Sequence, residues 1–245
     1  MGSPVLEFKH ADSDERVVHT LPYLFRIYAQ ILRAKGHIVL DYGGYQLIVV
    51  TMKYRTPRPT AESGLAKHTS AWQDLQRAIR IVRSKAAGYG LDPNQIGIMG
   101  SSAGGHLTLM GVTSSMHQTY LPIDDIDKVP CNVQWGIGIY PAYALTDGAS
   151  DPNTEKGNPD SAVLVPEFSF DLKTAPMLFL HGDADVYASM NSVKTWEKMR
   201  SMGIQSELHT LALRNHCFQV AASPGTGSYT WLERISDFLK YVVKE

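Results

Sequence analysis

The chain has 245 residues, of which 44% are hydrophobic, and its formal net charge at pH 7 is -1. A chain of this length can bury one sizeable core, so we expect a single domain over residues 1–245. Its 23 basic residues are scattered, which argues against a nucleic acid or an anionic membrane surface as partner and favours a small neutral molecule.

The two cysteines and the first residues of the chain bear on metal binding, disulfide bonding and cellular location. Cys131 and Cys217 lie in no Cys-x-x-Cys pair, so we expect no metal at them, and they allow at most one disulfide bridge. No apolar run approaches the roughly 20 residues of a membrane span. The first residues lead into charged positions rather than an apolar signal core. We expect a soluble chain, either cytoplasmic or exported with its signal removed.

Apolar strand-like runs alternate with amphipathic helix-like runs from about residue 20 onward. This alternation predicts an α/β fold with a mostly parallel sheet covered by helices. The N-terminal residues 1–45 fit it least well, and residues 21–35 are typical of a helix. The predicted strands are residues 47–53, 95–99, 133–140, 176–181 and 206–212. The predicted helices are residues 71–87, 103–112, 190–202 and 229–243. Residues 146–169 break both periodicities and are predicted to be a loop at the rim of a pocket.

The strand-like run before residue 100 leads into Gly100-Ser101-Ser102-Ala103-Gly104 and then into a helix of small residues. This Gly-x-Ser-x-Gly pattern makes Ser102 a candidate nucleophile at the apex of a strained strand-to-helix turn. We expect a side chain at either flanking glycine to collide with neighbouring backbone. The N-terminus of the helix then faces the negative charge that develops during attack by the serine.

A serine nucleophile needs a histidine as base and a carboxylate to orient that histidine, and here both are expected after residue 102. Asp185 follows the predicted strand 176–181, and Asp183 is the alternative acid. His216 follows the last predicted strand and is the candidate base. Among the other histidines, His106 lies on the helix behind the serine turn, and His68 is an alternative substrate contact.

Four segments resemble the α/β-hydrolase superfamily, and within it the small bacterial carboxylesterases and acetylesterases related to the hormone-sensitive-lipase and carbohydrate-esterase-like groups. They are Tyr54-Arg55-Thr56-Pro57, the helix of residues 72–80, residues 91–97 with Asp92-Pro93, and Gly100-Ser101-Ser102-Ala103-Gly104-Gly105-His106. The resemblance covers roughly residues 45–243. It implies a three-layer fold with helices on both faces of the sheet and no large cap. It also implies Ser102 as nucleophile, Asp185 as acid and His216 as base.

The N-terminal region departs from this family, whose members carry a His-Gly-Gly-Gly type of loop that gives amides to the oxyanion hole. Gly43-Gly44 is the early glycine pair here, and it directly precedes the predicted strand 47–53. We therefore expect the oxyanion hole to consist of the Ala103 amide with Gly43 and Gly44. In a second departure, Cys217 follows His216 where the family often has glycine.

The resemblance implies hydrolysis of short acyl esters, including those of acetylated sugars, with no metal or organic cofactor. Two alternatives remain: a serine peptidase of the prolyl-oligopeptidase type, and a hydrolase-like binding or scaffold protein with an idle triad. If the first strands of the sheet are absent, an exposed edge favours pairing with a second copy, so we expect a homodimer.

Overall fold

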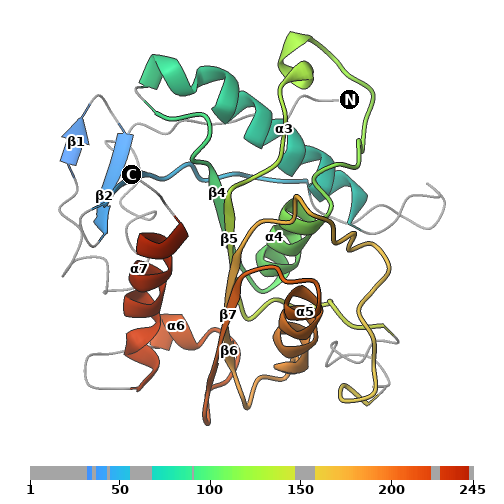
Figure 1. The fold of residues 1–245 in the computed structure, drawn as a ribbon. Coiled ribbons are helices and arrows are strands. Elements are labelled where there is room, and N and C mark those ends of the chain that lie inside the picture. Colours follow the sequence, from blue (N-terminus) through green and yellow to red (C-terminus); the bar gives the residue numbers. More distant parts are fainter. Residues whose placement is uncertain are drawn as a thin grey trace. The chain divides into compact units, whose positions relative to one another are not determined.

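The computed structural model describes residues 32–34, 37–42, 45–55, 68–89, 91–146, 158–221 and 227–242 (Figure 1). They belong to two compact units, which are treated separately below. The first contains Tyr54–His216, and the second comprises the described residues on either side of that segment. The single-domain expectation stays a prediction.

The first unit is built on a parallel sheet with the strand order β4-β5-β6-β7. Its strands are β4 (Gly97–Ser101), β5 (Trp135–Ile139), β6 (Met177–Gly182) and β7 (Ser206–Leu211). All six residues of β6 are buried. Burial of a parallel strand on both faces explains why this strand is a continuous apolar run in the sequence. The predicted α/β class and its parallel sheet are confirmed.

Helices connect these strands, and in Figure 1 α4 and α5 lie beside the sheet. The helices are α3 (Thr69–Lys85), α4 (Ala103–Thr113) and α5 (Met190–Ser201), with short 3-10 turns at Ala86–Tyr89 and Asp125–Lys128. Helix α4 contacts β4, β5 and α3, while α5 contacts β6 and β7. Leu109 and Met110 on α4 are fully buried. The predicted helices 71–87, 103–112 and 190–202 are therefore confirmed within two residues at each end.

A network of polar side chains holds α3 to the segment that precedes β5. The Arg77 guanidinium donates to Asp124 Oδ1 at 2.7 Å and lies 2.9 Å from Asp127 Oδ1. Tyr120 Oη donates to Asp127 Oδ1 at 2.5 Å and accepts from Arg80 Nη1 at 2.7 Å. Burial and the hydrogen bond to Asp127 raise the pKa of Tyr120 to about 12. The helix is thus fixed by charge-assisted hydrogen bonds as well as by its apolar face.

The second unit contains an antiparallel sheet, β1 (Leu32–Ala34), β2 (His37–Tyr42) and β3 (Tyr45–Ile48), and it also contains α6 (Phe218–Ala221), a 3-10 turn (Gly227–Thr230) and α7 (Trp231–Val242). Two predictions for this region are wrong. Of the predicted helix 21–35, residues 32–34 form a strand that pairs with β2, and the other residues lie outside the described part of the chain. The predicted strand 47–53 ends at Ile48, and its register is set by pairing with β2. In both cases partner strands outweigh local periodicity.

The predicted loop 146–169 is described at residue 146 and from residue 158 onward. Its described part contains no helix, and an isolated antiparallel bridge joins Leu145 to Leu164. Ala162 and Leu145 pack together in a small buried cluster under this segment. Both cysteines are free, with Cys131 buried and Cys217 exposed.

Candidate active site

Ser102 lies at the turn between β4 and α4 with φ 55° and ψ -121°. This conformation is strained for a residue with a Cβ, and such strain is typical of functional sites. The backbone is held in it because the Ser102 amide donates to Ile139 O at 3.0 Å and the Ala142 amide donates to Ser102 O at 3.2 Å. The turn is therefore fixed against the segment that follows β5.

Of the two glycines that flank Ser102, only Gly100 lies where a Cβ would collide with the backbone. A Cβ at Gly100 would overlap the carbonyl of Gly104, so a glycine is required there. A Cβ at Gly104 would meet nothing within 4 Å, and the expectation of a collision at this position is wrong. The close approach occurs one residue later, where a Cβ at Gly105 would lie 2.7 Å from Pro141 Cα. Gly104 therefore matters through its carbonyl, which leaves no room for a Cβ at Gly100, and not through its own lack of a side chain.

The structure brings Ser102, His216 and Asp185 into one chain of hydrogen bonds. His216 Nε2 lies 2.8 Å from Ser102 Oγ, and His216 Nδ1 lies 2.8 Å from Asp185 Oδ2. Asp185 is on the turn after β6, and His216 is on the turn after β7. Because Asp185 accepts at Nδ1, the favoured tautomer leaves Nε2 free to accept the serine proton. The alternative acid, Asp183, is exposed, and the carboxylate that bonds to His216 is that of Asp185.

The carboxylate of Asp185 is buried and well supplied with donors. Burial alone would raise its pKa, but the nearby His181 imidazole and the hydrogen bonds from the Tyr187 amide and His216 outweigh burial and hold the pKa below its usual range. The Tyr187 amide donates to Oδ1 at 2.8 Å, and His181 Nε2 lies 3.4 Å from Oδ2. Asp185 therefore stays ionised, as an orienting carboxylate must.

Sequence reasoning missed the residues that surround the His216 ring. The rings of Tyr140 and Tyr187 each have their centroid 4.6 Å from that of His216. Tyr140 follows β5 with φ 36°, and Tyr187 lies two residues after Asp185. Their positions directly after a strand and a candidate acid were the only signal in the sequence. Together they fix the plane of the imidazole.

The predicted oxyanion hole is described only in part. Ala103 is the first residue of α4, so its amide lies at the positive end of the helix dipole beside the nucleophile. Gly43 and Gly44 lie outside the described residues. Tyr42 and Tyr45, on either side of this glycine pair, are opposite each other in the antiparallel pairing of β2 and β3. A Gly-Gly pair between two strand-like runs is a hairpin signal.

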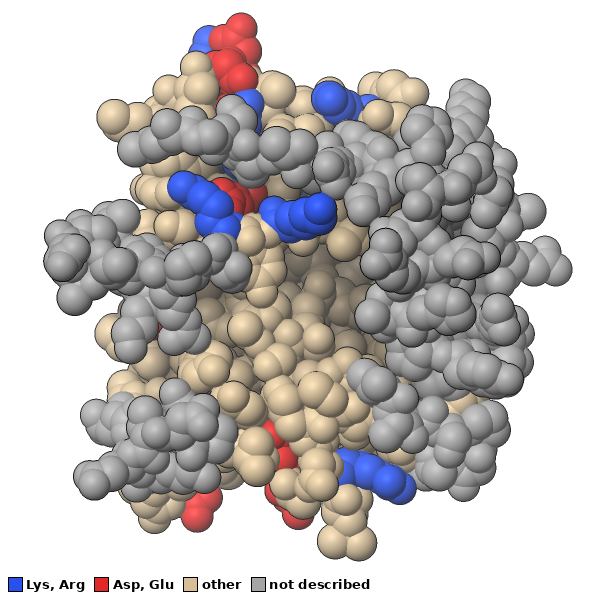
Figure 2. All heavy atoms as spheres, turned by 180° about the vertical axis from the view of Figure 1, so that it is seen from behind, with Lys and Arg blue, Asp and Glu red and all other residues tan. Residues whose placement is uncertain are grey.

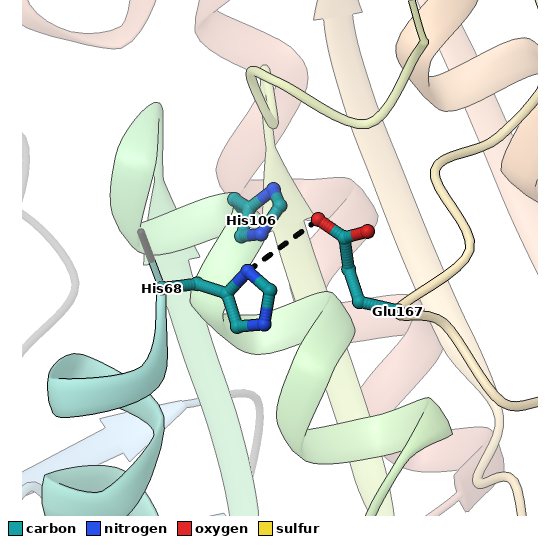
Figure 3. Close-up of side chains that lie close together, drawn as sticks. All are labelled: His68, His106 and Glu167. Atoms are coloured by element: carbon teal, nitrogen blue, oxygen red, sulfur yellow. Dashed lines mark ion pairs between the residues drawn. The ribbon is translucent and has the colours of Figure 1, made fainter. Parts of the chain in front are cut away.

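A second polar cluster lies near the first, built from His68, His106 and Glu167 (Figure 3). His68 immediately precedes α3, His106 is on α4, and Glu167 comes from the loop before β6. His68 Nδ1 lies 3.4 Å from Glu167 Oε1. The interaction with His68, which outweighs burial, lowers the pKa of Glu167. These three are the described residues whose donor atoms could hold a metal ion.

The charges of the described residues give no sign of a polyanionic partner on the face shown in Figure 2. Lysine and arginine side chains lie there in small groups near acidic ones, separated by a broad area without charge. Among the described helices, none combines the length and the apolar character that crossing a membrane requires.

The chain is similar to known esterases in sequence and in structure. Esterase LipQ of Mycobacterium tuberculosis is 30% identical over 182 residues, which make up 68% of this chain and 42% of that protein. The chain thus spans less than half the length of this curated relative. Among solved structures, the acetyl ester-xyloside bifunctional hydrolase from Caldicellulosiruptor lactoaceticus aligns with a TM-score of 0.60 and 23% identity over 73% of this chain and 68% of that chain.

The apo form of Thermogutta terrifontis esterase 2 aligns with a TM-score of 0.60 and 24% identity, over 81% of this chain and 73% of that chain. At these identities the structural likeness shows the fold, which is the α/β-hydrolase fold that the sequence predicted. The BD-FAE family model matches residues 36–199, more than half of the chain. The resemblance to small esterases is confirmed, and the chain belongs to the BD-FAE family.

Proposed function

We propose that this chain is a serine carboxylesterase that hydrolyses short-chain, acetyl-type esters, including those of acetylated sugars. The observation that carries the proposal is the hydrogen-bonded chain from Ser102 Oγ through His216 to Asp185, with both links at 2.8 Å. Support for the substrate class comes from the relatives, one named an esterase and one an acetyl ester-xyloside hydrolase.

The reaction proceeds through an acyl-enzyme. Ser102 Oγ attacks the ester carbonyl carbon while His216 Nε2 takes the hydroxyl proton, and Asp185 stabilises the imidazolium that forms. The carbonyl oxygen gains negative charge beside the N-terminus of α4, where the Ala103 amide stabilises it. The ester C–O bond then breaks, and His216 protonates the leaving alcohol. Water repeats the sequence on the acyl-serine and releases the carboxylic acid.

The test compares Ser102→Ala with Ser101→Ala on p-nitrophenyl acetate. Removing the nucleophile should lower kcat/KM by more than about 10⁴-fold. Ser101 is the last residue of β4 and lies outside the triad, so its variant should keep most of the activity. A fluorophosphonate probe should label the unsubstituted chain and the Ser101 variant, but not the Ser102 variant.

The outcomes separate the alternatives. Turnover retained by Ser102→Ala would rule out the mechanism, and a chain that neither labels nor hydrolyses would be the scaffold protein. Cleavage of prolyl peptides in preference to esters would identify the peptidase. A panel of acyl lengths and acetylated sugars then tests the substrate class: activity that rises with acyl length would contradict the preference for acetyl groups.

We also propose that the chain forms a homodimer through the β4 side of the parallel sheet. Among the described strands, β4 pairs only with β5. Met99 on β4 is 52% exposed. An unpaired strand edge beside an exposed apolar residue favours pairing with another chain. Light scattering after size exclusion should give twice the chain mass, and the mass of a single chain would contradict the proposal.

A further inference from the structure

We propose that His68, His106 and Glu167 form a binding site for a divalent transition-metal ion, and that Zn²⁺ is the ion favoured by the donors. The three side chains come from three separate segments: the residue before α3, the first turn of α4 and the loop before β6. Figure 3 shows them pointing toward one another. The site is separate from the Ser102, His216 and Asp185 group and does not depend on the proposed esterase activity.

The spacing of the donor atoms suits a small ion. All three lie within 4.8 Å of one another. A point therefore exists no farther than 4.8/√3, or about 2.8 Å, from each of them, and zinc bonds to nitrogen and oxygen require about 2.0–2.2 Å. Each donor needs to move inward by well under 1 Å. Small rotations about side-chain bonds supply that movement.

The pair His68 and Glu167 already has the separation of two zinc ligands. Their donor atoms are 3.4 Å apart. That is longer than the 2.7–3.2 Å of a good N–H···O hydrogen bond. It equals the edge of a tetrahedron whose bonds from the ion are about 2.1 Å. An ion between the two groups fits this distance better than a direct hydrogen bond does.

The segments that carry the donors are held in place independently of any ion. Ser114 Oγ donates to Glu167 O at 2.8 Å and accepts from the Ser169 amide at 3.0 Å, which fixes the backbone on both sides of Phe168. Phe168 is buried, and its ring packs 5.2 Å from that of His106. Prior fixation of the backbone lowers the entropy cost of binding.

The donor set selects the type of ion. Two imidazoles and one carboxylate suit Zn²⁺ and other transition metals, whereas Mg²⁺ and Ca²⁺ prefer sites made of oxygen alone. Three protein ligands leave a fourth position for water or another ligand. A bound ion would join the loop before β6 to α4, one helical turn after Ser102, so it would stabilise the loop next to the candidate active site.

Isothermal titration calorimetry tests the site on the full chain without an affinity tag, in a Cys217→Ser background because that exposed thiol can itself bind zinc. We expect one Zn²⁺ per chain and no heat from Mg²⁺. His68→Ala and Glu167→Gln should each weaken the zinc Kd at least about 100-fold, because loss of a ligand exceeds the 10–100-fold effect of removing an outer-shell partner.

The matched control is His209→Ala. His209 and Glu207 form another His–Glu pair at 3.4 Å, but the metal-binding group among the described residues does not include them. This variant should bind zinc like the parent. Anomalous scattering at the zinc edge from crystals of the parent chain gives a readout that requires no variant to fold. Absence of zinc binding by the parent, or equal binding by the His68 and Glu167 variants, would overturn the proposal.

Discussion

His181 gives the candidate catalytic carboxylate a second imidazole neighbour. It is fully buried on β6, its Nδ1 lies 2.8 Å from Ser192 Oγ, and its Nε2 lies 3.4 Å from Asp185 Oδ2. Desolvation lowers the pKa of His181, so the ring is neutral. An ionised Asp185 only accepts hydrogen bonds, so the favourable tautomer carries its proton on Nε2 and accepts the Ser192 hydroxyl proton at Nδ1. Ser192 thus sets the tautomer.

Replacing Ser192 with alanine should therefore alter catalysis although the side chain touches no reacting atom. Without the hydroxyl donor, His181 loses its preferred tautomer and directs its Nε2 proton toward Asp185 less often, so the pKa of Asp185 rises. We expect kcat to fall about tenfold and the acid limb of the pH profile of kcat/KM to move to higher pH. Steady-state kinetics on p-nitrophenyl acetate over a range of pH measure both effects.

Thr195→Val is the matched control for this prediction. Thr195 is equally buried on α5, and its hydroxyl donates to Asn191 O at 2.7 Å rather than to a group near the triad. Its variant should leave the pH profile in place, and Ser192→Thr should restore much of the parent behaviour. Identical profiles for Ser192→Ala and Thr195→Val would contradict the positioning role.

At the level of elements, the first turn of α4 depends on one glycine and not on its neighbour. Gly105→Ala would force a Cβ to 2.7 Å from Pro141 Cα, and overpacking of this kind costs about 1–3 kcal/mol. Gly104→Ala meets nothing within 4 Å and gains up to about 1 kcal/mol from the higher helix propensity of alanine. Urea unfolding should show opposite signs for the two variants. Equal destabilisation would contradict the packing described for this turn.

At the level of the whole molecule, the sequence predicted best the elements whose signals are local. The parallel strands β4 to β7 and the helices α4 and α5 stand where the sequence placed them, because their apolar runs and flanking small residues are local signals. The antiparallel sheet was missed. Leu32–Ala34 and Tyr45–Ile48 take their strand conformation from pairing with β2, and local periodicity does not record that pairing.

In the candidate site, too, residues with local sequence signals were predicted and residues brought together by the fold were not. Ser102, Asp185 and His216 were found from their order and their positions after strands, and their catalytic roles stay a prediction. The rings of Tyr140 and Tyr187 beside His216 were missed, and so was the grouping of His68 with Glu167. These pairs are 29 to 99 positions apart and come together only through the fold, so no spacing in the sequence predicts such contacts.

The pH dependence of stability combines groups from across the first unit. The pKa values of Asp124, Asp127, Glu167 and Asp185 are all lowered in the folded chain. A carboxyl group whose pKa is lowered by folding stabilises the fold above its unfolded pKa near 4, and this contribution is lost as the pH falls through the folded value. Urea unfolding should therefore show stability falling below about pH 4. Asp127→Asn should reduce the slope there, and an unchanged slope would exclude Asp127 as a contributor.

At alkaline pH, the stability of the fold depends on Tyr120, whose pKa is raised from 10.0 to about 12. A group whose pKa is raised by folding stabilises the fold below its unfolded pKa, and this contribution is lost as the pH rises through the folded value. The free energy of unfolding should therefore decline between about pH 10 and pH 12, by about 1–2 kcal/mol after allowance for solvent screening of a partly exposed group. Other tyrosines titrate in the same range, so the informative quantity is the difference between the parent chain and Tyr120→Phe. That difference should shrink as the pH rises, because the phenolate can no longer donate to Asp127. A difference that stays constant from pH 9 to pH 12 would show that the hydrogen bond from Tyr120 does not govern the alkaline limb.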